Sequence, residues 1–209
     1  MKKAYLLFVM VIIWSCSNND SESLNLATPV ALEATIITDS SFFADWTLVN
    51  EATEYQLQVA TDNMFANIQS TLNNLAGPSN VSNLNANTQY YYRVQASNLN
   101  TNYSSYSNII GVHTLPSTPI AEAASSITTS SFVANWQPVN GISTYLLYVS
   151  KSSPFSETSV LSSYNGIEVT GNSFEVKGLD FNTTYSYVIK AKSSERESEF
   201  SNSISLLTL

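Results

Sequence analysis

The sequence predicts an all-β protein made of two tandem β-sandwich modules, and two observations carry the prediction. The stretch "SSFFADWTLVN" at residues 40–50 returns as "SSFVANWQPVN" at residues 130–140. In both copies apolar residues alternate with polar ones, which is typical of strands that have one buried face. Several such strands separated by Asn, Ser and Gly turns indicate a sandwich or a barrel. No segment shows a convincing helical period.

A secretory signal is expected over residues 1–15. Lys2 and Lys3 precede an apolar run at residues 4–14. That run is too short to cross a bilayer, which needs about 20 residues. A basic start followed by a short apolar run is typical of a secretory signal. A buried strand or helix of the mature fold is the alternative.

The run ends in "IWSC", which resembles the lipobox of bacterial lipoproteins. Ile13, Ser15 and Cys16 occupy the aliphatic, small and cysteine positions. The resemblance implies that Cys16 carries lipid on sulfur and becomes the mature N-terminus. Acyl chains would then hold the protein on a membrane, because each buried CH₂ contributes about 0.8 kcal/mol. An ordinary secretory signal with an incidental cysteine is the alternative.

Residues 16–28 are expected to hold the lipidated cysteine and a flexible polar tether. Asp20 and Glu22 make this segment acidic. It is similar to the surface-export signals of some Gram-negative lipoproteins. We therefore expect the bacterial outer membrane as the location, and the sequence leaves open whether the protein faces the cell surface.

The internal repeat divides the rest into module 1 (29–114), a linker (115–117) and module 2 (118–209). The matched pairs are Pro29 and Pro119, Trp46 and Trp136, Tyr55 and Tyr145, Phe65 and Phe155, Leu84 and Leu179, and Tyr90 and Tyr185. The linker "LPS" contains a φ-restricted proline and leaves little slack. We expect an elongated, semi-rigid pair.

The stretches "LNANTQYYYRVQA" (84–96) and "LDFNTTYSYVIKA" (179–191) resemble the E–F corner and F strand of fibronectin type III domains. The resemblance implies two immunoglobulin-like β-sandwiches. Tyr90 and Tyr185 stand where that family places its tyrosine corner, whose phenol oxygen bonds to backbone just upstream.

The two repeated tryptophans are expected to fill the module cores. Cys16 is the single cysteine of the chain, so no intrachain disulfide can form. A module of this size buries only about 60–65% of its unfolded surface. Trp46 and Trp136 supply large side chains for the space between the sheets.

Composition and motifs disfavour nucleic-acid binding and catalysis. The net charge of −8 gives no electrostatic footprint for a phosphate backbone. His113 is the one histidine and has no second histidine or free thiol to partner it. Glu195, Glu197 and Glu199 alternate in one loop, where a solvated loop is favoured over a calcium site. The sequence predicts no enzyme activity, catalytic residue, cofactor or metal site.

The remaining candidates are surfaces. In module 1 the outward strand positions are polar: Gln56, Gln58, Tyr91, Arg93 and Gln95. In module 2 the outward positions Leu146, Tyr148 and Val188 are more apolar and form a candidate contact surface, for which a plain sheet face is the alternative. Tyr103 and Tyr164 are loop rings that either stack on sugars or cap the core.

These observations favour a non-catalytic, membrane-anchored envelope lipoprotein that serves as a spacer or protein-interaction module. Its partner would be a protein or a glycan of the cell envelope. One alternative is a carbohydrate-binding surface lipoprotein. Another is an accessory subunit of a glycan-uptake, hydrolase or secretion system.

Overall fold

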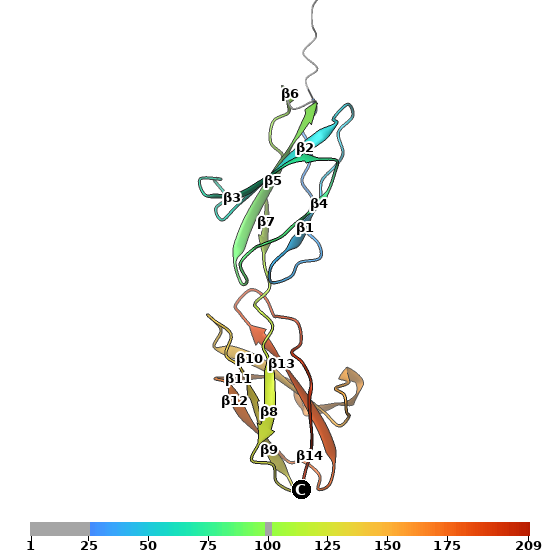
Figure 1. Ribbon diagram of the computed structural model, residues 1–209, viewed down its shortest axis with the longest axis vertical. Coiled ribbons are helices and arrows are strands. Elements are labelled where there is room, and N and C mark those ends of the chain that lie inside the picture. Colours follow the sequence, from blue (N-terminus) through green and yellow to red (C-terminus); the bar gives the residue numbers. More distant parts are fainter. Residues whose placement is uncertain (1–25, 99–101) are drawn as a thin grey trace, which may run out of the picture.

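The computed structural model describes residues 26–98 and 102–209, and Figure 1 shows two β-sandwiches that follow one another along the long axis. The predicted signal, Cys16 and most of the predicted tether lie outside the described residues. All strand pairs are antiparallel, which confirms the predicted all-β fold.

Module 1 packs a small sheet against a larger one. The small sheet pairs β1 (Phe42–Ala44) with β4 (Ser79–Val81) and is extended by bridges from Ala31 and Thr35. The larger sheet has the order β3 (Ile68–Leu75), β2 (Glu54–Ala60), β5 (Gln89–Asn98), with β6 (Asn102–Tyr103) and β7 (Ile110–His113) both paired to β5.

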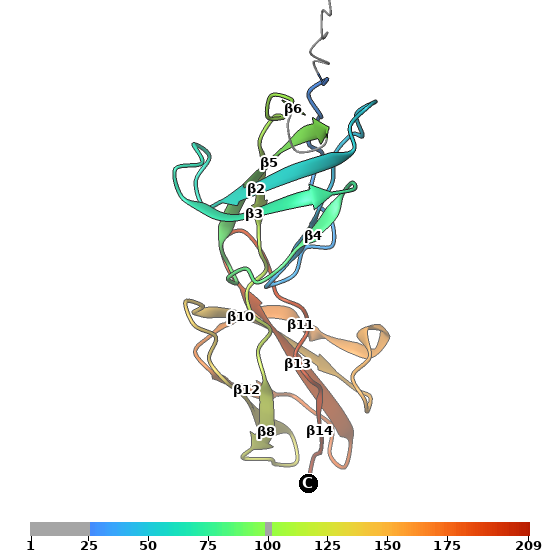
Figure 2. The ribbon, with the colours of Figure 1, turned by 45° about the horizontal axis from the view of Figure 1, so that its top comes forward.

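Module 2 repeats this arrangement, with longer strands in the smaller sheet. One sheet has the order β12 (Ser173–Lys177), β9 (Ser131–Trp136), β8 (Ala121–Ser125). The other has the order β11 (Val160–Thr170), β10 (Thr144–Ser150), β13 (Thr184–Lys192), β14 (Ile204–Leu207). A turn of 3₁₀ helix, η1 (Glu157–Ser159), precedes β11. Figure 2 shows the two sandwiches from a tilted direction.

Each module has its own core with a tryptophan in it. Trp46 is 2% exposed and Trp136 is 1% exposed. The Trp46 ring lies 5.7 Å from that of Tyr55, and Trp136 lies 5.5 Å from Tyr145 in the second copy. Rings of this size bury about 150–250 Å² each, so they dominate the packing between the sheets.

Tyrosine hydroxyls close both sandwiches in duplicate. Tyr90 accepts a hydrogen bond from the backbone N–H of Asn85 at 2.9 Å, and Tyr185 accepts one from Asp180 at 3.0 Å. This is the geometry expected at the two E–F corners. The sequence repeat therefore extends to the hydrogen bonds that hold the corners.

A second pair of tyrosines joins the sheets within each module. The hydroxyl of Tyr92 in β5 donates to the carbonyl of Leu32, and Tyr187 in β13 donates to that of Glu122 in β8. Burial is the main cause that raises the pKa of Tyr92 to about 12. Hydrogen bonds of buried phenols thus connect the sheets in a chain whose single cysteine excludes an intrachain disulfide.

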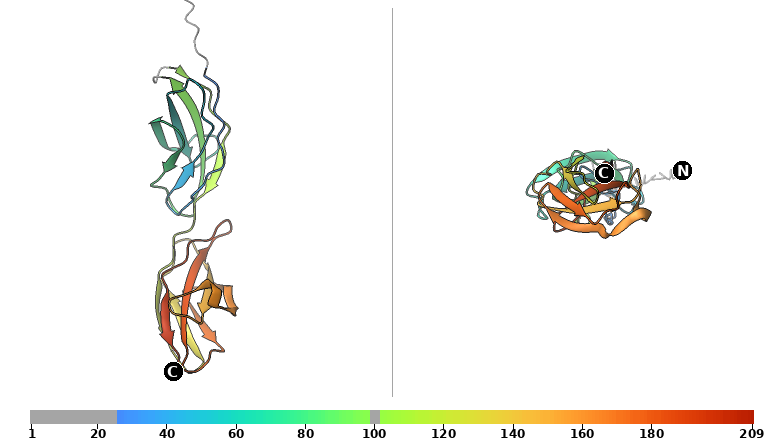
Figure 3. Two further views of the ribbon diagram at one scale, coloured as in Figure 1. Left: turned by 90° about the vertical axis from the view of Figure 1, so that its right-hand side faces the viewer. Right: turned by 90° about the horizontal axis from the view of Figure 1, so that it is seen from below.

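The linker is packed rather than loose. Leu115 donates a backbone hydrogen bond to the Thr38 carbonyl at 2.9 Å, and its own carbonyl accepts one from Asn87 at 2.9 Å. Pro116 and Pro119 are both buried. Figure 3 shows the resulting arrangement, in which the modules lie end to end.

Candidate functional site

The outer face of module 2's β10–β13 sheet is not the exposed apolar surface that the alternation predicted. Leu146 is 5% exposed and Val188 is 2% exposed. The loop after β13 brings Phe200 onto this face, where its ring lies 5.1 Å from that of Tyr148 and 5.6 Å from that of Phe155. The prediction that Leu146 and Val188 are open to a partner is wrong, because both side chains are buried.

Tyr148 is half-buried on the same face and has a packing role. Its ring lies over Gly166 of β11, where an added Cβ would come within 2.8 Å of the phenol oxygen. Gly166 also has φ +72°, a conformation that glycine adopts without strain. Burial, and then the charges of Glu197 and Glu157, raise the pKa of the Tyr148 phenol.

The two tyrosines considered for sugar stacking differ in their surroundings. The Tyr164 hydroxyl donates to the Lys177 carbonyl at 3.0 Å and accepts from the Lys177 N–H at 2.8 Å. This ring therefore ties β11 of one sheet to β12 of the other and packs against Phe174. Tyr103, in β6, is 42% exposed and stays at the surface.

The outer face of module 1 carries an arginine between two rings. The guanidinium carbon of Arg93 lies 4.1 Å from the ring centre of Phe65 and 3.9 Å from that of Tyr106. Its Nε and Nη2 both donate to Gln58 Oε1, at 3.0 and 2.8 Å. Sequence reasoning identified Arg93 as an outward residue but missed the enclosing rings. The repetition of Phe65 as Phe155 was the sequence signal that could have indicated a ring at this place.

Carboxamides surround this arginine. Gln56 Oε1 accepts hydrogen bonds from Gln95 Nε2 at 2.8 Å and from the Tyr106 hydroxyl at 3.0 Å. Gln56 Nε2 donates to Asn73 Oδ1 at 2.8 Å. The face is therefore a connected polar network that lies across β2, β3 and β5.

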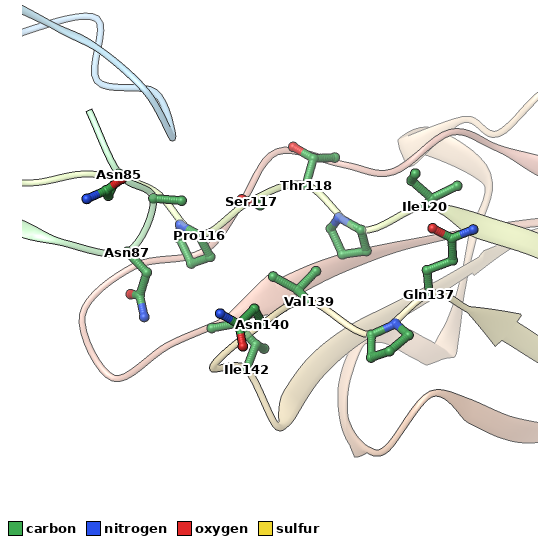
Figure 4. A pocket seen from close by; sticks show the side chains of 13 residues that line it. Asn85, Asn87, Pro116, Ser117, Thr118, Ile120, Gln137, Val139, Asn140 and Ile142 are labelled. Atoms are coloured by element: carbon green, nitrogen blue, oxygen red, sulfur yellow. The ribbon is translucent and has the colours of Figure 1, made fainter. Parts of the chain in front are cut away.

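A cavity of about 500 Å³ lies where the two modules meet, and Figure 4 shows the side chains around it. Asn85 and Asn87 come from module 1, Pro116 from the linker, and Gln137, Asn140 and Ile142 from module 2. None of the lining side chains is charged. The cavity therefore offers neutral hydrogen-bonding groups and apolar surface but no titratable group for acid–base chemistry.

The residues considered for catalysis or metal binding do not form a common site in the described part of the chain. His113 lies in β7, with Nδ1 3.0 Å from the Thr114 carbonyl oxygen. Glu197 pairs with Lys190 at 3.9 Å. Within residues 26–98 and 102–209, no group of three or more His, Cys, Asp or Glu side chains is placed to hold a metal. The same stretches contain no helix long and apolar enough to cross a membrane.

In comparisons with known proteins, both modules match the same protein family. The fibronectin type III domain matches residues 27–112 and 117–206. Among solved structures, a two-domain fibronectin type III segment of chicken tenascin has a TM-score of 0.53 and 19% identity, and covers 86% of this chain and 99% of that chain. The FN1–FN3 domains of chicken CNTN1 have a TM-score of 0.38 and 14% identity, with 87% and 69% covered. No curated protein matches the sequence.

Proposed function

Because this chain belongs to the fibronectin type III family, we propose that it is a non-catalytic spacer or interaction module anchored to a membrane by lipid on Cys16. Modules of this family are generally adhesion or spacer units. The observation that carries the proposal is the packed junction. Pro116 of the linker and Pro119 at the start of module 2 are buried, and Leu115 is bonded to module 1 at both its N–H and its carbonyl.

This junction favours a role in holding something at a distance from an anchor. The C-terminus lies at the end of module 2 that points away from module 1 (Figure 1), and module 1 separates Cys16 from module 2 along the chain. A lipid at Cys16 would therefore leave module 2 far from the membrane. The net charge of −8 disfavours contact with an anionic lipid surface and supports a protein that extends away from it.

The proposed location is the bacterial outer membrane, and the proposed partner is a protein or glycan of the cell envelope. Contact would be made through loops and sheet faces, as in other proteins that display β-sandwich modules. On this proposal His113 has no catalytic part.

Metabolic labelling with a fatty-acid analogue tests the anchor. We expect the wild-type protein to carry label in a bacterial host and Cys16→Ala to carry none. A Cys16→Ala protein that is still labelled, or a wild-type protein that never is, contradicts lipidation at this residue. Protease treatment of intact cells then shows whether the modules are on the cell surface.

A further inference from the structure

Arg93 is held in one orientation by its neighbours. Phe65 and Tyr106 lie on either side of the guanidinium at 4.1 and 3.9 Å, and Gln58 accepts two of its hydrogen bonds. An arginine has five N–H donors in a fixed plane. The Nη1 edge has no partner among the described residues, and the stacked rings leave it little rotational freedom.

No carboxylate of the described chain neutralises this arginine. The ion pairs in residues 26–98 and 102–209 are formed by Lys151, Lys177, Lys190 and Lys192. Within the described part of module 1, Arg93 is the one cation. A buried or half-buried arginine usually has an anionic partner, because its charge is costly to remove from water. Here the protein supplies a glutamine oxygen instead.

The second module shows that packing alone does not require an arginine here. Val188 is the equivalent of Arg93 in the repeat, and it is 2% exposed. The ring at position 155 repeats Phe65, and Phe200 takes the place of Tyr106. Both copies therefore keep the pair of rings, whereas the residue at the position of Arg93 is cationic in module 1 and aliphatic in module 2. Module 2 also has a cation at the corresponding ring, Lys190, whose Nζ lies 4.4 Å from the Phe200 ring centre and pairs with Glu197. What distinguishes module 1 is an arginine that has no carboxylate partner among the described residues.

We propose that Arg93 and the carboxamides around it bind the carboxylate of an acidic saccharide. Arginine binds carboxylates with paired, charge-assisted hydrogen bonds. Gln58 Nε2, Gln95 Oε1 and Asn73 Nδ2 are not used by the described hydrogen bonds of this network. These groups match the hydroxyls of a sugar ring beside its acid group.

A saccharide fits this face better than a protein partner does. Protein interfaces depend on a few buried aromatic or apolar anchors. On this face both aromatic rings are already stacked on the guanidinium, and the other side chains of the polar network are the amides of Gln56, Gln58, Gln95 and Asn73. The site does not depend on lipidation of Cys16, so it can be tested separately from the proposed anchor.

Calorimetric titration of the protein tests the site with two matched probes, an oligomer of a hexuronic acid and a neutral hexose oligomer of the same length. We expect heat of binding from the uronate only. Arg93→Val, which installs the residue found in module 2, should weaken binding by about tenfold or more, because it removes charge-assisted hydrogen bonds. Arg93→Lys should also weaken it, since an ammonium lacks the planar fork. Lys190→Gln, a charge removal in module 2, is the matched control and should leave binding unchanged.

Thermal melts show whether each variant is folded. If Arg93→Val does not fold, Arg93→Lys is the variant that tests the site. Absence of uronate binding by the wild-type protein, or equal binding by a folded Arg93→Val or Arg93→Lys variant, overturns the proposal. Equal binding of the neutral oligomer overturns the role of the carboxylate. A polyglutamate peptide provides the remaining arm: if it binds through Arg93 as tightly as the uronate, the ligand is an acidic protein segment and the saccharide assignment is wrong.

Discussion

The ring of Tyr148 lies directly against Gly166, so that a Cβ at this glycine would meet the phenol oxygen at 2.8 Å. Tyr148 of β10 pairs with Asn165 of β11, and Gly166 is the extra residue of β11 at the register shift between Leu147 and Tyr148. A ring placed over a glycine is a means by which sheets compensate for the missing side chain. The contact explains why Tyr148 is only partly open to solvent.

Gly166→Ala is predicted to destabilise module 2 more than Gly171→Ala does. Both glycines have positive φ, +72° and +80°, so both variants incur a backbone cost of about 1 kcal/mol. Only at Gly166 does the new Cβ also clash, because nothing lies within 4 Å of a Cβ at Gly171. Denaturant unfolding of both variants measures the difference. Equal losses of stability would show that Tyr148 does not press on Gly166. If Gly166→Ala is the more destabilising variant, combining it with Tyr148→Ala should remove the difference.

Trp136→Ala is predicted to lower the free energy of unfolding of module 2 by about 3–5 kcal/mol, the usual cost of a large cavity. Because the modules have separate cores, module 2 should then unfold before module 1. Trp136→Phe should cost less, since the indole Nε1 has no hydrogen-bond partner among the described residues and its loss strands no acceptor. Calorimetry with Trp46→Ala as the reciprocal control checks the assignment. A single unshifted transition for Trp136→Ala would refute it.

Stability is predicted to fall at high pH through Tyr92. Its pKa is raised from an ordinary value of 10.0 to about 12 in the folded protein, first by burial. The neutral phenol is therefore favoured in the folded state, and the stabilisation is complete below pH 10 and lost as the pH rises toward 12. Denaturant unfolding at a series of pH values measures the slope. Tyr92→Phe should make the slope shallower, whereas an unchanged slope would assign the effect to other groups, among them Tyr187, whose pKa is also raised.

The fold and its core residues could be predicted from the sequence because they follow from alternation and repetition. The period of two placed Trp46, Trp136, Tyr90 and Tyr185 on inward faces, and all four are at most 2% exposed. The resemblance to tandem fibronectin type III domains is confirmed by the family match over both modules. Lipidation of Cys16 stays a prediction.

The outer surfaces could not be predicted in the same way. Alternation tells which side of a sheet Leu146 and Val188 occupy, but not what covers that side. Phe200, whose ring packs against Tyr148 on that side, lies in a loop without periodicity, so its return onto the sheet is a tertiary effect. The stacking of Arg93 between Phe65 and Tyr106 was missed for the same reason: its partners come from two loops that flank the sheet.

The most direct test of the spacer is the distance distribution between the modules. Spin labels on Gln69→Cys in β3 and Ser162→Cys in β11, both exposed positions, report it by pulsed electron resonance in a Cys16→Ser background. The packed linker predicts one narrow distribution, which should broaden when Pro116 and Pro119 are both replaced by glycine. A broad distribution in the protein with its own linker would contradict a semi-rigid spacer.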